Sequence, residues 1–202
     1  TPLNAIVGFS QLLNSDMPLE PEEKAEFIDL ITKNSDLLLK LINDILDLSR
    51  IESGSMSFSY ENLDLSKLMG DIFHTHQLMM PEGVELKIRV PHEPLIIRSD
   101  HFRLTQVCTN FINNAVKFTE EGHIRVSCEE DKSRHVLRFV IEDTGIGIRP
   151  DESDRIFERF YKVDTFTKGS GLGLAIANEI MELVGGRIYL DDTYCGGCRF
   201  IV

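Results

Sequence analysis

Three short patterns in the second half of the chain combine residue types that could bind a phosphorylated ligand. The first places Asn110, Asn114 and Lys117 inside an apolar-periodic stretch that predicts a helix. Side chains spaced four and three positions apart share one helix face. Amide oxygens suit Mg²⁺ and an ammonium group attracts phosphate, so this face could hold Mg²⁺ and a polyphosphate. Taken alone, the pattern is also typical of a solvated helix face.

The second pattern is Asp143-Thr144-Gly145-Ile146-Gly147, which directly follows a predicted strand. A carboxylate at a strand end could accept a hydrogen bond from an exocyclic amine of a ligand. The glycines that follow would let the backbone approach that ligand closely. By itself this pattern is also common in ordinary connections between a strand and a turn.

The third pattern is Gly169-Ser170-Gly171-Leu172-Gly173, a glycine-rich stretch that opens a predicted helix. Backbone N–H groups at a helix N-terminus form a natural phosphate site. The spacing differs from the G-x-x-x-x-G-K-S/T pattern of a P-loop, and the stretch does not follow a strand within a βαβ unit. Neither a P-loop nor a Rossmann site fits.

The residues before Gly54 predict a helical hairpin, with one helix over about residues 3–13 and a second from Pro21 onward. The second helix has a heptad seam, with steps of four and three. Its members are Phe27, Ile31, Asn34, Leu38, Leu41, Ile45 and Leu48. One hairpin exposes more apolar surface than it can cover, so we expect a homodimeric four-helix bundle. Packing of this face on the rest of the same chain is the alternative.

The residues after the hairpin alternate between strand and helix patterns, which predicts an α+β fold with one sheet covered by helices. Strands are expected at residues 57–60, 84–90, 95–97, 123–129, 136–143, 187–190 and 199–202. Helices are expected at residues 64–79, 100–118 and 172–184. Asp64 and Asp100 stand where they would cap the first two of these helices.

In their order along the chain, the three patterns resemble the N, G1 and G2 boxes of sensor histidine kinases, with Phe157 and Phe160 resembling the F box. Residues 1–54 are similar to the dimerisation and histidine-phosphotransfer hairpin of that family, and residues 55–202 to its ATP-binding catalytic domain. The resemblance implies a Bergerat-type α/β sandwich with a mixed sheet and helices on one face, the fold shared with gyrase, Hsp90 and MutL ATPases.

The resemblance also implies roles for the residues that match family motifs. Asn114 would coordinate Mg²⁺, with Asn110 and Lys117 supporting the phosphates of ATP. Asp143 would accept the adenine amino group. The other implied ATP-site residues are Gly145, Gly147, Ile148, Lys162, Lys168, Gly169, Gly171, Leu172 and Gly173. Leu172 and Ile148 fit an adenine pocket and an ordinary core equally well.

The implied function is that of an ATP-dependent protein-histidine kinase core. Such a core transfers the ATP γ-phosphoryl to a His on the hairpin and then to an Asp of a response-regulator receiver domain. Thr1-Pro2-Leu3 resembles the end of the H-E-x-R-T-P-L motif, so the phosphoacceptor His would lie four positions before Thr1. We therefore expect this fragment to bind ATP but not to autophosphorylate. Thr1 stands at the position linked in the family to phosphatase activity.

Two other functions stay open on the sequence. An ATP-hydrolysing clamp of the gyrase or MutL type carries a Glu at the position of Asn110, as a base for water, and an amide cannot take that proton. A non-catalytic dimeric signalling module is the second alternative. All six histidines are expected to be structural or surface residues: His74, His76, His92, His101, His123 and His135.

Composition excludes several other classes of protein. The 202 residues include 21 Lys and Arg against 33 Asp and Glu, a formal net charge of −12, which argues against binding to nucleic acid. No run approaches the ~18 apolar residues that a membrane span needs, so no direct membrane contact is expected. Four cysteines do not make a disulfide scaffold, which favours a cytoplasmic location. Cys195-Gly196-Gly197-Cys198 is expected to be a plain hairpin turn, with a redox or metal role as the alternative.

Overall fold

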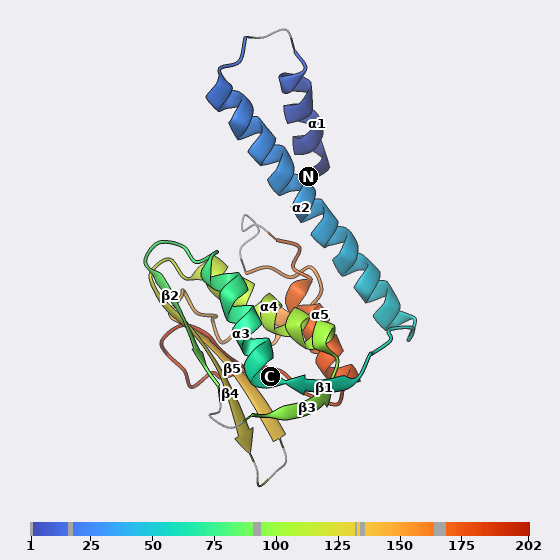
Figure 1. Cartoon of the computed structure of the whole chain (residues 1–202), viewed down its shortest axis with the longest axis vertical. Helices are drawn as coiled ribbons and strands as arrows, with labels where there is room; N and C mark the ends of the chain where they lie inside the picture. The colour runs from blue at the N-terminus through green and yellow to red at the C-terminus, as the bar shows by residue number, and fades with distance from the viewer. Residues whose placement is uncertain (1, 16–17, 91–93, 132, 134–135, 164–168) are drawn as a thin grey trace. The chain divides into compact units, whose positions relative to one another are not determined.

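The computed structural model describes residues 2–15, 18–90, 94–131, 133, 136–163 and 169–202, and it divides into two compact units (Figure 1). The first unit comprises residues 1–56 and 167–170, and the second comprises residues 57–166 and 171–202. The first unit contains a helical hairpin, and the second contains the sheet with its covering helices.

Two helices make up the hairpin: α1 (Pro2–Leu13) and α2 (Pro21–Glu52). Helix α2 begins at a proline and a capping box, in which the Glu20 backbone N–H donates to the Glu23 carboxylate over 2.9 Å. Acidic side chains stabilise this end because the first N–H groups of a helix lack backbone partners. The rings of Phe9 and Phe27 stack with their centroids 5.4 Å apart, which joins α1 to α2.

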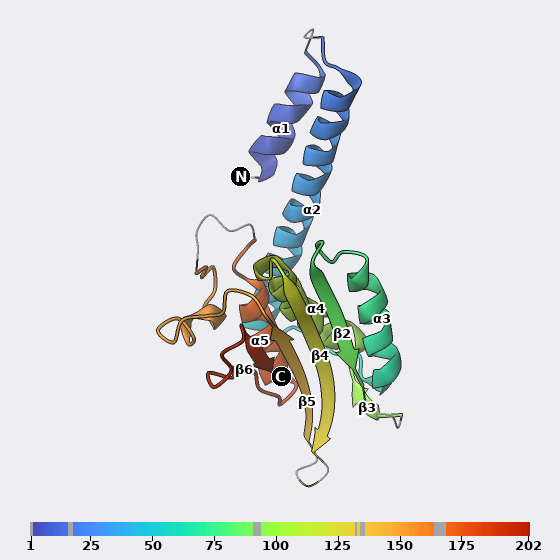
Figure 2. The ribbon, with the colours of Figure 1, turned by 90° about the vertical axis from the view of Figure 1, so that its left-hand side faces the viewer.

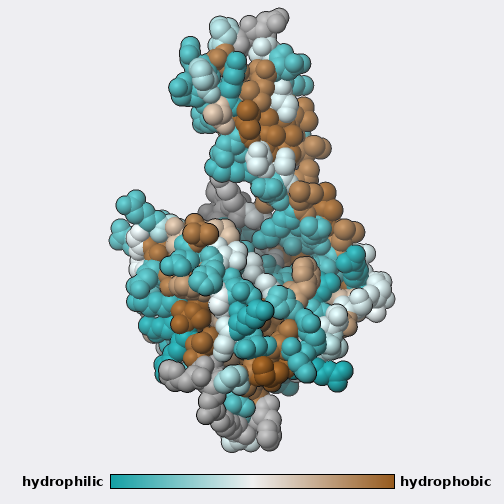
Figure 3. Space-filling model, in the orientation of Figure 1, coloured by the Kyte–Doolittle hydropathy of each residue, from teal (hydrophilic) through white to brown (hydrophobic). Residues whose placement is uncertain are grey.

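A row of large apolar side chains on α2 is exposed. We call Ile28, Leu39, Ile42 and Leu46 the exposed hairpin stripe; their exposed fractions lie between 46% and 60%. Figure 3 shows hydrophobic surface along the hairpin. The predicted seam is therefore accompanied by a second apolar row that the hairpin itself leaves uncovered. No helix among the described residues is both long and apolar enough to cross a bilayer.

A five-stranded mixed sheet forms the centre of the second unit. Its strands are β2 (Val84–Arg89), β4 (Gly122–Asp131), β5 (Val136–Asp143), β6 (Tyr189–Leu190) and β7 (Arg199–Ile201). The order across the sheet is β2-β4-β5-β7-β6, with β2 parallel to β4 and the other neighbours antiparallel. This order places the C-terminal β7 beside β5, so Cys198, just before β7, lies next to Asp143.

Three helices cover one face of this sheet: α3 (Leu65–Gln77), α4 (His101–Phe118) and α5 (Gly173–Leu183) (Figure 2). Ile124 of β4 and Ile141 of β5 point to this side and are at most 1% exposed. Phe111 of α4 packs on Phe200 of β7, with ring centroids 4.9 Å apart. The architecture confirms the expected α+β class and the sandwich with a mixed sheet and helices on one face.

The predicted strand at residues 57–60 is wrong. The strand begins directly after that stretch, as β1 (Glu61–Asp64), and pairs antiparallel with β3 (Ile96–Ser99) in a separate two-stranded sheet. The Ser59 backbone N–H instead donates to the Asp100 carboxylate over 2.7 Å, so it is used by a helix cap rather than by a strand ladder. Asp100 also caps α4, and its side chain accepts from the Arg103 N–H.

Candidate functional site

Asp143 ends β5 and is almost completely buried, with an exposed fraction of 4%. Its Oδ1 accepts hydrogen bonds from the Gly145 N–H at 2.9 Å and the Cys198 N–H at 3.1 Å. Burial raises the pKa of Asp143 above its usual value, while these donors and the Cys198 thiol oppose that rise. The result is a carboxylate with a fixed orientation, suited to accept a hydrogen bond from a ligand amine.

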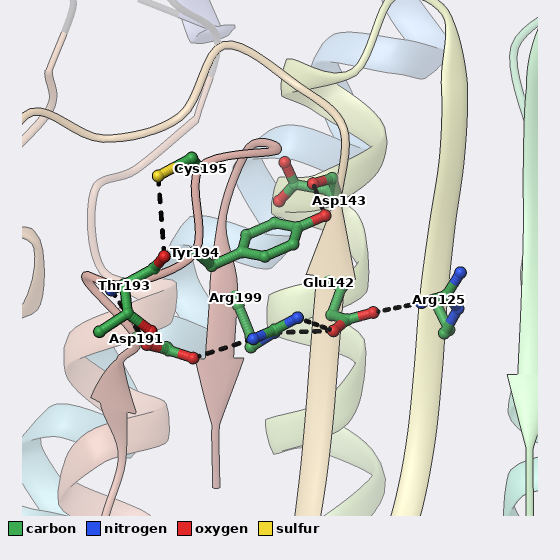
Figure 4. Close-up of polar contacts among 8 residues, drawn as sticks. All are labelled: Arg125, Glu142, Asp143, Asp191, Thr193, Tyr194, Cys195 and Arg199. Atoms are coloured by element: carbon green, nitrogen blue, oxygen red, sulfur yellow. Dashed lines mark hydrogen bonds and ion pairs between the residues drawn. The ribbon is translucent and has the colours of Figure 1, made fainter.

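The turn between β6 and β7, near the C-terminal end of the sequence, packs against Asp143. The Tyr194 hydroxyl donates to the Asp143 backbone carbonyl over 3.4 Å, as Figure 4 shows. Gly197 lies against the same carbonyl, where a Cβ would come within 2.2 Å of the oxygen. Residues about 50 positions further along the chain therefore fix the acceptor at the end of β5.

Gly145 brings the turn after β5 against the end of α4. A Cβ on Gly145 would lie 2.3 Å from the Phe118 carbonyl oxygen. The next residue, Ile146, donates its N–H to that same oxygen over 3.3 Å. The close approach joins the second predicted pattern to the end of the helix that carries the first. Gly147 follows with a φ of +72°.

Helix α4 carries the three predicted polar residues of the first pattern. Asn110 is buried, and its Nδ2 donates to the Gly173 carbonyl at the start of α5 over 3.0 Å. Asn114 is half-buried, and Lys117 is exposed with its ammonium 4.7 Å from the centroid of the Phe118 ring. The Asn110 hydrogen bond joins the first pattern to the third, so all three patterns meet around α4.

The third pattern is only partly included in this site. Gly171 has a φ of +70° and its carbonyl accepts from the Phe160 N–H over 2.9 Å. Leu172 is fully buried, which favours the core alternative for this residue, and Ile148 is half-buried. Gly169 belongs to the first unit. Two expected residues, Lys168 and Thr1, lie outside the described residues.

An ion-pair cluster holds the segment between the second and third patterns. Arg149 donates to both carboxylate oxygens of Glu152, over 3.1 and 2.9 Å. The Tyr161 hydroxyl donates to Glu152 over 3.3 Å, and the Arg155 guanidinium lies 4.4 Å from the Tyr161 ring centroid. Glu152 is only 5% exposed, so it ties the two ends of this segment together. Lys162, the expected phosphate contact, follows Tyr161 directly and is half-buried.

The two phenylalanines that resemble the F box, Phe157 and Phe160, have different environments. Phe157 meets Phe200 edge to face, with ring centroids 6.4 Å apart, and so reaches the sheet. Phe160 is 66% exposed and has a φ of +64°, a left-handed conformation that is strained for a residue with a Cβ. Phe157 therefore anchors the segment, while Phe160 forms its tight turn beside Gly171.

Two protein families match this chain. Residues 99–202, just over half of it, match the family described as histidine kinase-, DNA gyrase B-, and HSP90-like ATPase. Residues 1–54 match the His Kinase A (phospho-acceptor) domain. The chain belongs to the sensor histidine kinases. The two families occur here in the order that the sequence patterns predict, hairpin first and ATPase-type domain second.

Named relatives agree with this family. The autoinducer 2 sensor kinase/phosphatase LuxQ of Vibrio cholerae is 36% identical over 208 residues, covering 99% of this chain and 24% of that protein. The sensor protein GacS of Pseudomonas syringae is 36% identical over 214 residues, covering 99% of this chain and 23% of that protein. This histidine kinase core thus spans about a quarter of the length of these relatives.

Solved histidine kinase structures share the fold. Full-length ShkA, in complex with AMPPNP, superposes with a TM-score of 0.78 at 31% identity, over 99% of this chain and 42% of that one. The Acinetobacter baumannii histidine kinase AdeS superposes with a TM-score of 0.76 over 100% of this chain and 93% of that one. At 20% identity, the second match shows the fold alone.

Sequence reasoning missed a row of charged side chains across the sheet of this histidine kinase core (Figure 4). Glu142, beside Asp143, accepts from Arg125 of β4 over 2.8 Å and from Arg199 of β7 over 2.7 Å. Arg199 also donates to Asp191 over 3.1 Å, and its guanidinium lies 4.2 Å from the Tyr194 ring centroid. Only the strand register reveals the row, because its members are far apart in the sequence.

The histidines that the structure describes form no metal-binding cluster with cysteines or acidic residues. His76 is buried, and its Nδ1 pairs with the Ile72 carbonyl of the same helix over 2.8 Å. Its Nε2 is buried and has no hydrogen-bond partner among the described residues. His92 and His135 lie outside the described residues.

Proposed function

We propose that this chain is the core of an ATP-dependent protein-histidine kinase. It would transfer the γ-phosphoryl group of ATP to a histidine on the hairpin, and then to an aspartate of a response-regulator receiver domain. Membership of the sensor histidine kinases supports the proposal, as do relatives named sensor kinases. The activity and partners remain a proposal because the chain spans only about a quarter of those relatives.

Asp143 is the proposed acceptor for the adenine amino group. Its burial excludes competing water, and the two backbone N–H donors on Oδ1 hold the carboxylate in one orientation. The structure of ShkA contains AMPPNP, an ATP analogue, which supports ATP as the nucleotide for a chain of the same fold. Gly145 and Gly147 would shape the pocket beside Asp143 by letting the backbone turn closely around the base.

Asn114 is the proposed Mg²⁺ ligand, and Lys117 the proposed phosphate contact. Both lie one turn apart on α4, and an amide oxygen with an ammonium group is a donor set that fits Mg²⁺ and polyphosphate. When bound, Mg²⁺ would neutralise phosphate charge during transfer. The backbone around Gly171 and Gly173 would donate N–H groups to the phosphates at the start of α5.

The presence of an amide at Asn110, rather than a carboxylate, is the observation that favours phosphoryl transfer over hydrolysis. Its amide donates to the Gly173 carbonyl, and it therefore supports the phosphate-binding start of α5. An amide cannot remove a proton from water at neutral pH, so this position supplies no base for hydrolysis. Positioning and charge neutralisation are sufficient for transfer to an imidazole, which is itself a strong nucleophile.

The exposed hairpin stripe supports a homodimer as the working form. Four large apolar side chains that are about half exposed on one helix are best covered by the same stripe of a second copy, which completes a four-helix bundle. The hairpin would also present the phosphohistidine to the response regulator. We place the core in the cytoplasm; the unpaired state of its four cysteines fits a reducing compartment.

One assay tests the proposed function. The chain is extended upstream by the H-E-x-R segment and supplied with Mg²⁺ and γ-labelled ATP. We expect protein-bound phosphate that is labile in acid and stable in base, as phosphohistidine is. Replacing the added His by Gln should abolish the label while leaving nucleotide binding intact. Steady release of inorganic phosphate without label would instead indicate an ATPase clamp, and neither signal would indicate a non-catalytic module.

Asn114→Ala tests the proposed metal site in the same protein. We expect the Mg²⁺-dependent part of nucleotide affinity to disappear, because the amide oxygen on the helix face is removed. Asn113→Ala is the matched control, since its side chain is exposed on the adjacent helix position. Equal Mg²⁺ dependence in both variants would remove Asn114 from the site.

A further inference from the structure

The turn Cys195-Gly196-Gly197-Cys198, which we call the CGGC turn, lies directly against the proposed adenine acceptor. The Cys198 backbone N–H donates to the Asp143 carboxylate over 3.1 Å. Gly197 contacts the Asp143 carbonyl, and the Tyr194 hydroxyl just before the turn donates to it. Any covalent change that moves this turn must therefore move the surroundings of Asp143.

The two cysteines of the CGGC turn differ in access. Cys195 is exposed, and its sulfur donates to the Thr193 carbonyl over 3.7 Å (Figure 4). Cys198 is buried, and burial together with the charge of Asp143 raises the pKa of its thiol to about 12. The Cys198 sulfur thus keeps its proton in the reduced protein. An oxidant from solvent would meet Cys195 first.

The other two cysteines are expected to react with such an oxidant more slowly than Cys195. Cys108 and Cys128 are buried in the core, with exposed fractions of 1% and 4%. Burial raises the pKa of the Cys108 thiol to about 12 and that of Cys128 to about 11. Thiol oxidation proceeds through an accessible thiolate, so these two are protected.

We propose that Cys195 and Cys198 form a reversible disulfide when a hydroperoxide oxidises the protein, and that this disulfide weakens nucleotide binding by drawing the Cys198 N–H and Gly197 away from Asp143. The inference rests on the proposed function of Asp143 as the adenine acceptor. It assigns to the CGGC turn a modification site that couples thiol oxidation to the nucleotide site.

The chemistry balances in two steps. The Cys195 thiol reacts with hydrogen peroxide to give a sulfenic acid and one water. The Cys198 sulfur then attacks the sulfenic sulfur and loses its proton, which combines with the departing hydroxide to give a second water. Two cysteine sulfurs are oxidised by one electron each, and one peroxide is reduced to two waters. A dithiol such as dithiothreitol reverses the reaction by thiol–disulfide exchange.

Ring closure has a direct structural consequence at Asp143. The two cysteines lie three positions apart with only glycines between them, so no intervening side chain hinders a bridge. The Cys198 sulfur must turn toward Cys195, and the carboxylate loses the Cys198 N–H donor as that residue moves. Gly197, packed on the Asp143 carbonyl, must move as the turn tightens. Loss of one hydrogen bond to a charged acceptor weakens affinity by roughly tenfold.

The test compares reduced and oxidised chain of residues 1–202. The protein is treated with hydrogen peroxide, and binding of a fluorescent trinitrophenyl-ATP is titrated with Mg²⁺ before treatment, after it, and after dithiothreitol. Peptide mapping locates the disulfide independently of binding. We expect a Cys195–Cys198 disulfide, an affinity weakened by about tenfold, and full recovery on reduction. Cys195→Ser, which keeps Cys198 on Asp143, should bind like the parent and lose nothing on peroxide treatment.

Three outcomes would overturn the inference while leaving the proposed function intact. These are a reduced chain that binds nucleotide but forms no Cys195–Cys198 disulfide, a disulfide that forms with unchanged affinity, and an equal loss of affinity in Cys195→Ser. A reduced chain that fails to bind the nucleotide would overturn the proposed function itself, and the inference with it.

Discussion

Gly145→Ala offers a sharp test of how the proposed adenine site is built. The added methyl group would lie 2.3 Å from the Phe118 carbonyl oxygen and 2.9 Å from its carbonyl carbon. The shorter distance is 1.1 Å inside the 3.4 Å at which ordinary contact begins. Both neighbouring atoms are backbone at the end of α4, so no side chain can swing aside. The turn after β5 must move away from α4.

The magnitude follows from what that movement breaks. Forcing a methyl group into packed structure costs about 1–3 kcal/mol. The shift also strains the 3.3 Å hydrogen bond from Ile146 to Phe118 and the 2.9 Å hydrogen bond from Gly145 to Asp143. We expect Gly145→Ala to lower the free energy of unfolding by about 2 kcal/mol and to weaken nucleotide binding by at least about tenfold.

Gly70→Ala is the matched control, because it makes the same chemical change in the same unit. Gly70 lies inside helix α3, and a Cβ there would have nothing within 4 Å. Alanine favours a helix interior over glycine by about 0.5–1 kcal/mol. This variant should therefore be more stable than the parent and bind nucleotide equally well.

Urea unfolding, followed by far-ultraviolet circular dichroism, measures the stability of both variants, since the chain has no tryptophan. Titration with trinitrophenyl-ATP measures the site. Opposite signs of the two stability changes would support the described contact. If Gly145→Ala binds nucleotide as tightly as Gly70→Ala and unfolds at the same urea concentration, the close approach of the turn to α4 is refuted.

Three further predictions concern charge and assembly. Burial raises the pKa of Asp143, so between pH 3.8 and that raised pKa the native state holds a proton that the unfolded chain releases. The free energy of unfolding should therefore fall as the pH rises through this range. The fall should be less steep in Asp143→Asn, which does not titrate. Burial alone would raise the pKa of Asp100, but hydrogen bonds from the Arg103 and Ser59 N–H groups lower it overall. The contribution of Asp100 to stability is therefore present above pH 3.8 and is lost as the pH falls through its native pKa. Asp100→Ala should cost about 1–2 kcal/mol at pH 7 in urea unfolding, and less in acid. Ile42→Glu, within the exposed hairpin stripe, should convert a dimer to a monomer in light scattering, whereas Lys33→Glu on the opposite face should stay dimeric.

Local patterns were sufficient to predict most of the helices. Asp64 and Asp100 cap α3 and α4 as expected, because a short acidic side chain before an apolar-periodic stretch satisfies the first free N–H groups of a helix. The three nucleotide-type patterns were readable for the same reason, since each is contained within a few neighbouring residues. Their order along the chain was enough to indicate the family.

The pairing of strands was harder to predict from the sequence than the helices were. The short extended stretch at residues 57–60 has the alternation of a strand, yet β1 forms at Glu61–Asp64 because its partner β3 lies there. Alternation shows only that a segment can be extended. Which backbone groups find partners depends on segments far along the chain, and the Ser59 N–H finds a side chain instead.

The sequence by itself determined the family, the two-part organisation that we propose, and the residue types available for ATP. Only the tertiary structure decided what surrounds Asp143. The Cys198 N–H donor and the Glu142–Arg199 pair come from residues 55 and 57 positions away, and Asn110 meets Gly173 across 63 positions. These contacts exist because the sheet order places β7 beside β5 and because α5 begins next to α4. A pattern confined to neighbouring residues carries no record of such pairings.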